Sequence, residues 1–522
     1  MKFIIQKTNI KLLKMKLKYL SVPVLALIMA ACGSAPDYRN AIPAKSAALV
    51  AIDVNSMAEK SGLSGDNIDK GLLARFKNMV NSGLAGSEVL VDRIFDDADE
   101  SGLGLKEKIY LFMGEQAKMG GLLVKVTDRD KLEELLEALK KQQICTQPKE
   151  ADGCEWTVIG NWLLAYNDGA MVLVSDNKGS DPKSLVRQAS MWLRQKDGEG
   201  FSASDDFKQM EQKEGDIVLW SSLEVLPHEA VYPLTMGVSA ELRLKDVKAV
   251  STVDFMTGKT VMDVEMLVDD NVMKGILDKK QQVTADVKGN YLDVFPQNTP
   301  FWATANIKGG EFYDFICENP SVRRYFEKSM IPLDFRSVFN AINGDVALSM
   351  SGQDGKEFIA FADVTTDEFL KSFETLKSMA ALSGGQVVLR NYGDNGYEFK
   401  TVDGSLVGFT PGYLALWIGV KDGRLYVTNK ESLVDRRVLG LSLRNRDWGK
   451  RVEGQRFFMV SDLTSLDRLF ELKKLKGTMA SVLAFFGGLD YLTAESADGE
   501  NVHIEIVMKD RGRNPLSALL DN

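Results

Sequence analysis

The sequence predicts an α+β protein made of two tandem, related domains, in which mainly antiparallel sheets are covered by packed helices. Three observations support this prediction. Short segments of alternating apolar residues indicate strands, amphipathic stretches between them indicate helices, and the same order of elements occurs twice along the chain. With 522 residues, of which 45% are hydrophobic and 26% charged, the chain is long enough for more than one core.

The first strand of each domain follows a proline. Pro43 precedes the alternating segment 48–53, and Pro296 precedes the similar segment 301–306. A helical pattern follows each of them, as expected when a sheet is covered by helices. The second half of the sequence therefore restarts the order of elements that opens the first half.

A strand followed by an amphipathic helix comes next in each half. The segments 121–128 and 358–365 are apolar enough to be strands. In the first helix, apolar residues recur at i, i+3, i+4 and i+7, which places them on one face: Leu132, Leu135, Leu136 and Leu139. In the second helix Phe369, Phe373 and Leu376 do the same, and Thr365 with Glu368 has the spacing of a capping box.

Hairpins follow the helices in both halves. Asp168-Gly169 and Asp422-Gly423 each lie between apolar runs, and Asp-Gly favours the positive φ angles of tight hairpin turns. A further hairpin turns at Gly258 in the first half and at Gly499 in the second. We therefore place the first domain at residues 41–285 and the second at 293–522, with turn residues between them.

The N-terminus has the features of a bacterial lipoprotein signal. Basic residues precede an apolar stretch, residues 20–31, which ends in Ala30-Ala31 directly before Cys32. Small residues before the cleavage point are typical of secretory signals, and a cysteine after them can carry the lipid. The sequence predicts a signal peptide over 1–31, of which 1–14 is interpreted as an upstream extension, and a lipidated tether over 32–40.

The charge of the mature chain argues against nucleic acid as a partner. The whole sequence has a formal net charge of −9, and the predicted signal contains six lysines and no acidic residue, so its removal lowers the charge by six, to −15. Nucleic acids and anionic lipid headgroups need neutralising cations. The predicted contact with the membrane is therefore the N-terminal lipid.

The sequence resembles a Gram-negative lipoprotein family carrying the domain of unknown function numbered 4836. The resemblance rests on the signal that ends at Cys32, on Ile42-Pro43-Ala44-Lys45 before the first strand, and on the restart at Asn298-Thr299-Pro300. It covers nearly all of the mature chain. The family has no established biochemical activity, so the resemblance implies no functional residues.

Three cysteines remain after the lipidated one. Cys145 and Cys154 flank a loop with a proline and a glycine, and in an oxidising compartment this spacing is compatible with either a disulfide or two free thiols. Cys317 lies in an aromatic helical stretch and is expected to be a buried, small apolar residue.

The segment 97–102 resembles the beginning of a calcium-binding loop. Asp97, Asp99 and Ser101 supply oxygen atoms at positions 1, 3 and 5, and a glycine follows at position 6. Position 12, which should be a glutamate, is Lys108. Calcium is therefore a weak candidate cofactor, and we favour a solvated acidic linker between a helix and a strand.

The sequence contains no recognisable catalytic set. The mature chain has two histidines, His228 and His503, and neither belongs to a zinc-binding or nucleophile motif. His503 alternates with apolar residues, which predicts a place on one face of a strand. Tryptophans are candidate sugar platforms, but Trp220, Trp302 and Trp417 lie in apolar runs and are expected to fill cores.

We interpret the chain as a non-enzymatic lipoprotein of the cell envelope that binds a protein, a glycan or another ligand through its duplicated domains. The alternative is a hydrolase that acts on glycan or peptide through carboxylates that sequence does not reveal. The expected location is the outer membrane, and both its periplasmic and its outer face remain open.

Overall fold

The computed structural model groups the chain into two compact units. The N-terminal unit contains the described residues of 37–225, 248–262 and 512–521, and the C-terminal unit contains those of 263–511 together with Val247. The structure describes residues 37–65, 68–83, 88–114, 119–176, 182–225, 247–267, 271–327, 333–351, 356–407, 411–435, 438, 440–464 and 486–521.

The N-terminal unit is built on an antiparallel sheet with the strand order β4-β5-β6-β7-β3-β2-β1-β8-β9. Its strands are β1 (Ser46–Ile52), β2 (Ile109–Gly114), β3 (Met119–Lys125), β4 (Lys149–Ala151), β5 (Cys154–Ile159), β6 (Trp162–Tyr166), β7 (Ala170–Asp176), β8 (Ile217–Ser222) and β9 (Lys248–Met256). Its helices are α2 (Val54–Ser61), α3 (Lys70–Gly83), α4 (Glu88–Asp96), α5 (Arg129–Lys141), α6 (Pro182–Leu193), α7 (Asp205–Glu211) and α16 (Pro515–Asp521).

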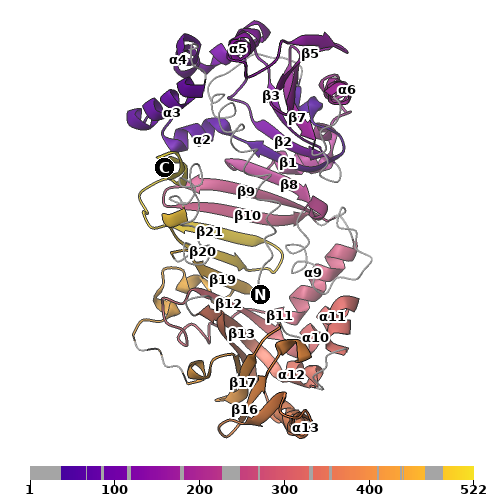
Figure 1. Ribbon diagram of the computed structural model, residues 1–522, viewed down its shortest axis with the longest axis vertical. Helices are drawn as coiled ribbons and strands as arrows, with labels where there is room; N and C mark the ends of the chain where they lie inside the picture. Colours follow the sequence, from indigo (N-terminus) through magenta and orange to yellow (C-terminus); the bar gives the residue numbers. More distant parts are fainter. Residues whose placement is uncertain are drawn as a thin grey trace. The chain divides into compact units, whose positions relative to one another are not determined.

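The C-terminal unit contains an antiparallel sheet with the strand order β15-β16-β17-β18-β14-β13-β12-β19-β20-β21. Figure 1 shows β19, β20 and β21 side by side. The strands are β11 (Thr284–Ala285), β12 (Phe301–Lys308), β13 (Ile342–Ser351), β14 (Glu357–Val364), β15 (Val387–Asn391), β16 (Gly396–Thr401), β17 (Leu414–Lys421), β18 (Arg424–Thr428), β19 (Phe457–Asp462), β20 (Leu489–Ser496) and β21 (Val502–Met508). The helices are α9 (Asn271–Val283), α10 (Gly309–Cys317), α11 (Pro320–Glu327), α12 (Phe335–Ala341) and α13 (Lys371–Ala381).

The α+β class that the sequence predicted is the class of the structure, and its strands lie where alternation placed them. The Asp-Gly pairs predicted as turns connect β6 to β7 and β17 to β18. At the second of these turns Asp422 and Gly423 have φ angles of 51° and 72°, which is the positive-φ geometry of a type I′ hairpin.

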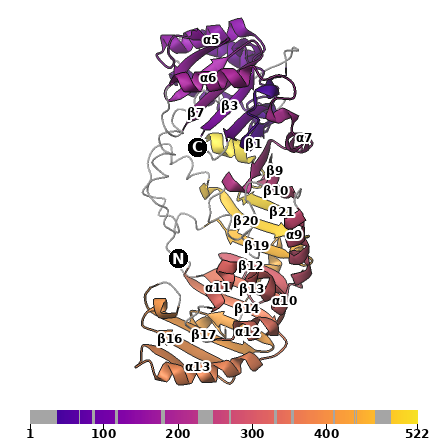
Figure 2. The same cartoon turned by 90° about the vertical axis from the view of Figure 1, so that its right-hand side faces the viewer.

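Helix α5 covers one face of the N-terminal sheet with the apolar stripe expected from its sequence. Leu132, Leu135 and Leu136 are buried against β3 and β7, whereas Leu139 is only partly buried. In the C-terminal unit, Phe373 and Leu376 of α13 are buried in the same way against β15, β16 and β18. Figure 2 shows α13 lying against this part of the sheet.

The start of α13 differs from the prediction. Phe369 lies in a short 3-10 turn, η7 (Glu368–Leu370), and the α-helix begins only at Lys371. The expected capping box does not form, because the Thr365 hydroxyl donates to the carbonyl of Ala341 and Asp367 occupies the N-cap position of the 3-10 turn. Contacts made across the fold therefore override the local capping signal.

The two sheets have the same spatial order of strands. When the N-terminal sheet is followed from its edge strand β4 to β9, and the C-terminal sheet from its edge strand β15 to β20, each strand of one has a counterpart in the other: β3 corresponds to β14, β1 to β12 and β8 to β19. This correspondence agrees with the expected repeat, whose origin by duplication stays a prediction. The compact units do not follow the predicted borders at 285 and 293. The division falls within β10 (Lys259–Leu267), and residues 512–521 group with the N-terminal unit, where Asn514 Nδ2 donates to Phe255 O at 2.9 Å.

Candidate functional site

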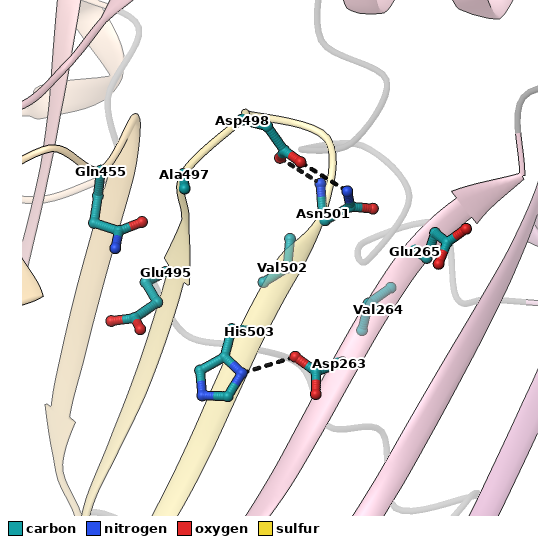
Figure 3. A pocket seen from close by; sticks show the side chains of 10 residues that line it. All are labelled: Asp263, Val264, Glu265, Gln455, Glu495, Ala497, Asp498, Asn501, Val502 and His503. Carbon is teal, nitrogen blue, oxygen red and sulfur yellow. Dashed lines mark hydrogen bonds and ion pairs between the residues drawn. The ribbon is translucent and has the colours of Figure 1, made fainter. Parts of the chain in front are cut away.

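A cavity of about 280 Å³ opens on one face of the C-terminal unit, at the end of β20 and β21 where the turn between them lies. Figure 3 shows its side chains, which come from β10, β20, β21, the β20–β21 turn and the segment before β19. The residues that line it are Asp263, Val264, Glu265, Gln455, Glu495, Ala497, Asp498, Asn501, Val502 and His503.

Strand register places the polar side chains on the same face of the sheet. Glu495 of β20 lies opposite His503 of β21, and Thr493 lies opposite Glu505. Directly opposed residues of an antiparallel pair project to the same side, and residues two apart on one strand share a face. A row of polar groups therefore crosses a sheet whose neighbouring positions are apolar.

His503 joins two strands through its ring. Its Nδ1 lies 2.7 Å from Oδ1 of Asp263 on β10, and its Nε2 lies 3.6 Å from Oε1 of Glu505 on its own strand. The side chain of His503 is 34% exposed and that of Glu505 is 9% exposed. The imidazole thus stands between an exposed carboxylate, Asp263, and a buried one, Glu505. Figure 3 shows its contact with Asp263.

Arg451 binds two buried carboxylates, those of Glu505 and Glu495. It ends the short 3-10 turn η11 (Gly449–Arg451). Its Nη1 is 2.7 Å from Glu505 Oε2 and 3.6 Å from Glu495 Oε1, and its Nη2 donates to Thr493 Oγ1 at 3.0 Å. Buried carboxylates need such partners because an isolated buried charge is strongly unfavourable.

The β20–β21 turn forms the rim of the cavity and is held by Asp498. The Asp498 carboxylate accepts from the backbone N–H groups of Glu500 and Asn501, each at 2.8 Å, and from Nδ2 of Asn501 at 2.7 Å. Burial acts to raise the pKa of Asp498, but these hydrogen bonds outweigh it and lower the pKa. Lys280 of α9 donates to the carbonyl of Gly499 at 2.6 Å and fixes the turn from outside.

The lining is acidic and carries no hydroxyl, thiol or ammonium group among its described residues. The described lining contains one imidazole, that of His503, and four carboxylates: Asp263, Glu265, Glu495 and Asp498. Oε1 of Gln455 is buried and accepts no hydrogen bond from the described part of the chain. The described residues contain no group of three or more His, Cys, Asp or Glu side chains arranged to hold a metal ion. The cavity therefore presents hydrogen-bond acceptors and negative charge.

A family model described as "Domain of unknown function (DUF4836)" matches residues 38–516. The chain belongs to this family. The match spans both units, and it agrees with the resemblance seen in the sequence.

Among solved structures, crystal forms I, III and IV of TP0453 match this DUF4836 protein. Each match has a TM-score of 0.27, and the sequence identities are 8%, 8% and 9%. The matches cover 48%, 49% and 44% of this chain and 88%, 91% and 81% of the TP0453 chains. A search of the curated proteins finds no match to this chain.

Of the two alternatives left open for Cys145 and Cys154, the structure of this DUF4836 protein has the free thiols. Both thiols are free and buried. Cys145 lies opposite Ile159, at one end of β5, and Cys154 begins that strand at the other end. The length of β5 separates them by about 16 Å, whereas a disulfide needs Cα atoms about 4.4–6.8 Å apart. Cys317, which was expected to be buried, is partly exposed.

The calcium-loop residues lie in a 3-10 turn, η2 (Ala98–Ser101), between α4 and β2. Asp97 Oδ1 accepts from the N–H of Asp99 at 3.1 Å, and the fully buried Ser101 hydroxyl donates to the carbonyl of Ala98 at 2.7 Å. The structure explains why position 102 is a glycine without a bound ion. Gly102 has a φ of +73°, and a Cβ there would lie 2.2 Å from Asp128 O. Calcium binding at this turn stays a prediction.

The remaining residues named in the sequence analysis are three tryptophans, a cysteine and a histidine. Trp220, Trp302 and Trp417 are buried, as expected for core residues. Cys32 and His228 lie outside the described residues.

Sequence reasoning missed the partners of His503. Asp263 is 240 positions away, so only the pairing of β10 with β21 brings the two together. A signal was present, because Asp263 and Glu265, like His503 and Glu505, alternate with apolar residues on strands that were predicted. Such alternation indicates a polar stripe on one sheet face, although it does not show which stripes meet.

Proposed function

We propose that this protein is a lipid-anchored, non-enzymatic binding protein of the bacterial envelope, and that the cavity of its C-terminal unit binds a ligand through a cationic group. The observation that carries the proposal is the cavity itself, an acidic recess with four carboxylates in its lining. Its volume lies near the lower end of ligand pockets, which hold about 300–1,000 Å³. A single ammonium or guanidinium group with its stem suits this volume better than a glycan chain.

Electrostatics support a cation. A unit charge 4 Å from an opposite one interacts by about 4 kcal/mol at the effective dielectric constant of a protein surface, and hydrogen bonds to charged groups contribute about 1.5–3 kcal/mol each. Gln455 places a further acceptor at the same recess. An anionic ligand would meet like charge on most sides.

The same lining argues against the alternative, a hydrolase that uses carboxylates. The described lining offers no hydroxyl or thiol nucleophile. Glu505 is bound to Arg451 and Asp263 to His503, and the pKa of Asp498 is lowered. A general acid needs a raised pKa, so these carboxylates are better suited to binding.

Binding is tested by calorimetry on the full mature chain with N-acetyl-lysine amide as the probe. N-acetyl-norleucine amide, which has the same four-carbon side chain without the ammonium group, is the control ligand. We expect the lysine probe to bind and Asp263→Asn to weaken it by up to about fivefold, because the Asp263 side chain is 60% exposed and an exposed ion pair contributes about 0–1 kcal/mol. The exposed Asp394 supplies the matched variant, Asp394→Asn. Equal binding of both probes, no binding, or equal effects of the two variants would contradict the proposal.

Anchoring through Cys32 is supported by the sequence before it, a basic and apolar segment that ends in Ala30-Ala31. No helix among the described residues is long and apolar enough to cross a membrane. We expect Cys32→Ala to move the protein from the membrane fraction of lysed cells to the soluble fraction, while Cys317→Ala stays with the membranes. Immunoblotting of the fractions checks this, and membrane retention of the Cys32 variant contradicts it.

A further inference from the structure

His503 lines the acidic recess and is the only imidazole among its described residues. Its ring contacts Asp263 at 2.7 Å and approaches Glu505 at 3.6 Å, and Glu495 is its direct neighbour across the strand pair. Further charged groups of the elements around it line the recess or bind its neighbours: Glu265 of β10, Glu495 of β20, Asp498 of the β20–β21 turn and Arg451 of η11.

The neutral and the protonated imidazole can donate different numbers of hydrogen bonds to the neighbouring carboxylates. A neutral ring has one N–H. When Nδ1 donates to Asp263, the lone pair of Nε2 faces Glu505, so the ring satisfies only one of its two acidic neighbours. A protonated ring has two N–H groups, one for each carboxylate, and its charge neutralises the recess from within.

We propose that a proton on His503 and the cationic group of a ligand compete for the negative charge of Asp263, which contacts the imidazole and lines the cavity, so that this cavity releases its ligand as the surroundings become acidic. This inference rests on the proposed function and adds its regulation. By linkage, a ligand that binds more tightly when His503 is unprotonated must also weaken the binding of the proton to His503. Arg451 stays charged throughout, so it does not contribute to the change.

Histidine is the side chain whose charge ordinarily changes between about pH 5 and 8. A lysine side chain remains charged over this range. The affinity for N-acetyl-lysine amide should therefore fall by about tenfold between about pH 8 and about pH 5.5. The carboxylates ordinarily titrate below this range.

The test is calorimetry of the full mature chain over this pH range, with His503→Gln as the variant. Glutamine keeps an N–H donor for Asp263 but does not titrate, so the readout is the slope of affinity against pH. We expect a slope in the wild type and none in His503→Gln. A flat wild-type profile, or equal slopes in both proteins, would overturn the inference.

A second measurement reports the competition directly. In a His228→Gln background, His503 is the only histidine, and its imidazole nitrogen signals in NMR report its protonation. Adding the lysine probe near the midpoint should deprotonate the ring, whereas the norleucine probe should not. Lack of binding at about pH 8 contradicts the proposed function, while binding at that pH without any effect on the imidazole contradicts only the competition.

Discussion

Replacing Asp345 with alanine is expected to lower the free energy of unfolding of the C-terminal unit by about 3–5 kcal/mol. Asp345 is fully buried. Its carboxylate accepts from the backbone N–H groups of Lys288 and Asn290 at 2.9 and 3.0 Å, and from Nδ2 of Asn306 at 2.9 Å. Alanine leaves these donors without their acceptor, and each unsatisfied buried polar group costs about 1–3 kcal/mol.

The position of Asp345 explains why the effect should extend beyond one residue. Its own N–H donates to Asp363, which also accepts from the Tyr291 hydroxyl at 2.8 Å. The two aspartates therefore hold the segment before β12 against the sheet, where Tyr291 is one of the residues of the aromatic core. Urea unfolding, followed by tryptophan fluorescence, measures the change.

Two further variants make this result interpretable. Asp345→Asn keeps the shape of the side chain but removes the charge and turns one acceptor into a donor, so an intermediate loss of stability is expected. Asp394→Ala removes an exposed aspartate of the same unit and should change stability by less than about 0.5 kcal/mol. A loss below about 1 kcal/mol for Asp345→Ala would show that the buried hydrogen bonds matter little.

Local signals in the sequence predicted the strands, the hairpins and the buried faces of the helices well. Asp422-Gly423 requires only the conformations of two adjacent residues, and the stripe on α5 requires only the geometry of one helix. Both features depend only on residues that are close together in the sequence. The structure confirms both, because no distant partner is needed to form them.

Features that depend on distant partners were missed or left undecided. Cys145 and Cys154 lie nine positions apart, but the register of β5 separates them. Conversely, Asp263 and His503 meet across 240 positions. Sequence separation is a poor guide to distance once strands pair, because register places residues at opposite ends of a strand or side by side.

The placement of α16 illustrates the same limit at the level of units. Its residues belong to the second predicted domain, 293–522, yet they pack in the N-terminal unit, where the hydroxyl of Ser517 donates to the carbonyl of Ser61 at 2.9 Å. The apolar pattern of this helix predicts that it is buried. The pattern does not indicate against which of the two similar units the helix packs.

Within the N-terminal unit, Asp216→Ala is expected to reduce the free energy of unfolding by about 3–5 kcal/mol, since it removes a buried carboxylate and leaves its several donors without their acceptor. Asp216 is 1% exposed. Lys60 Nζ lies 2.7 and 2.8 Å from its two oxygens, the hydroxyl of Ser56 donates at 2.6 Å, and the N–H of Phe255 donates at 2.7 Å. The carboxylate thus connects α2 to β9.

The neighbouring Asp254 offers a matched control. It lies 3.7 Å from the same lysine, but its side chain is 36% exposed, and exposed ion pairs contribute about 0–1 kcal/mol. If burial decides the strength of these contacts, Asp254→Ala should have a small effect where Asp216→Ala has a large one. Similar losses in the two variants would contradict this reasoning.

Lys60→Met separates the ion pair from the remaining hydrogen bonds. The Lys60 side chain is 35% exposed, so its own loss exposes little apolar surface, and methionine keeps much of its length. The substitution leaves Asp216 with its hydroxyl and backbone donors, and a loss of about 2–3 kcal/mol is expected. A double-mutant cycle with Asp216→Ala then gives the coupling energy of the pair. A coupling near zero would assign the stabilisation to the neutral donors, Ser56 and Phe255, instead of to the lysine.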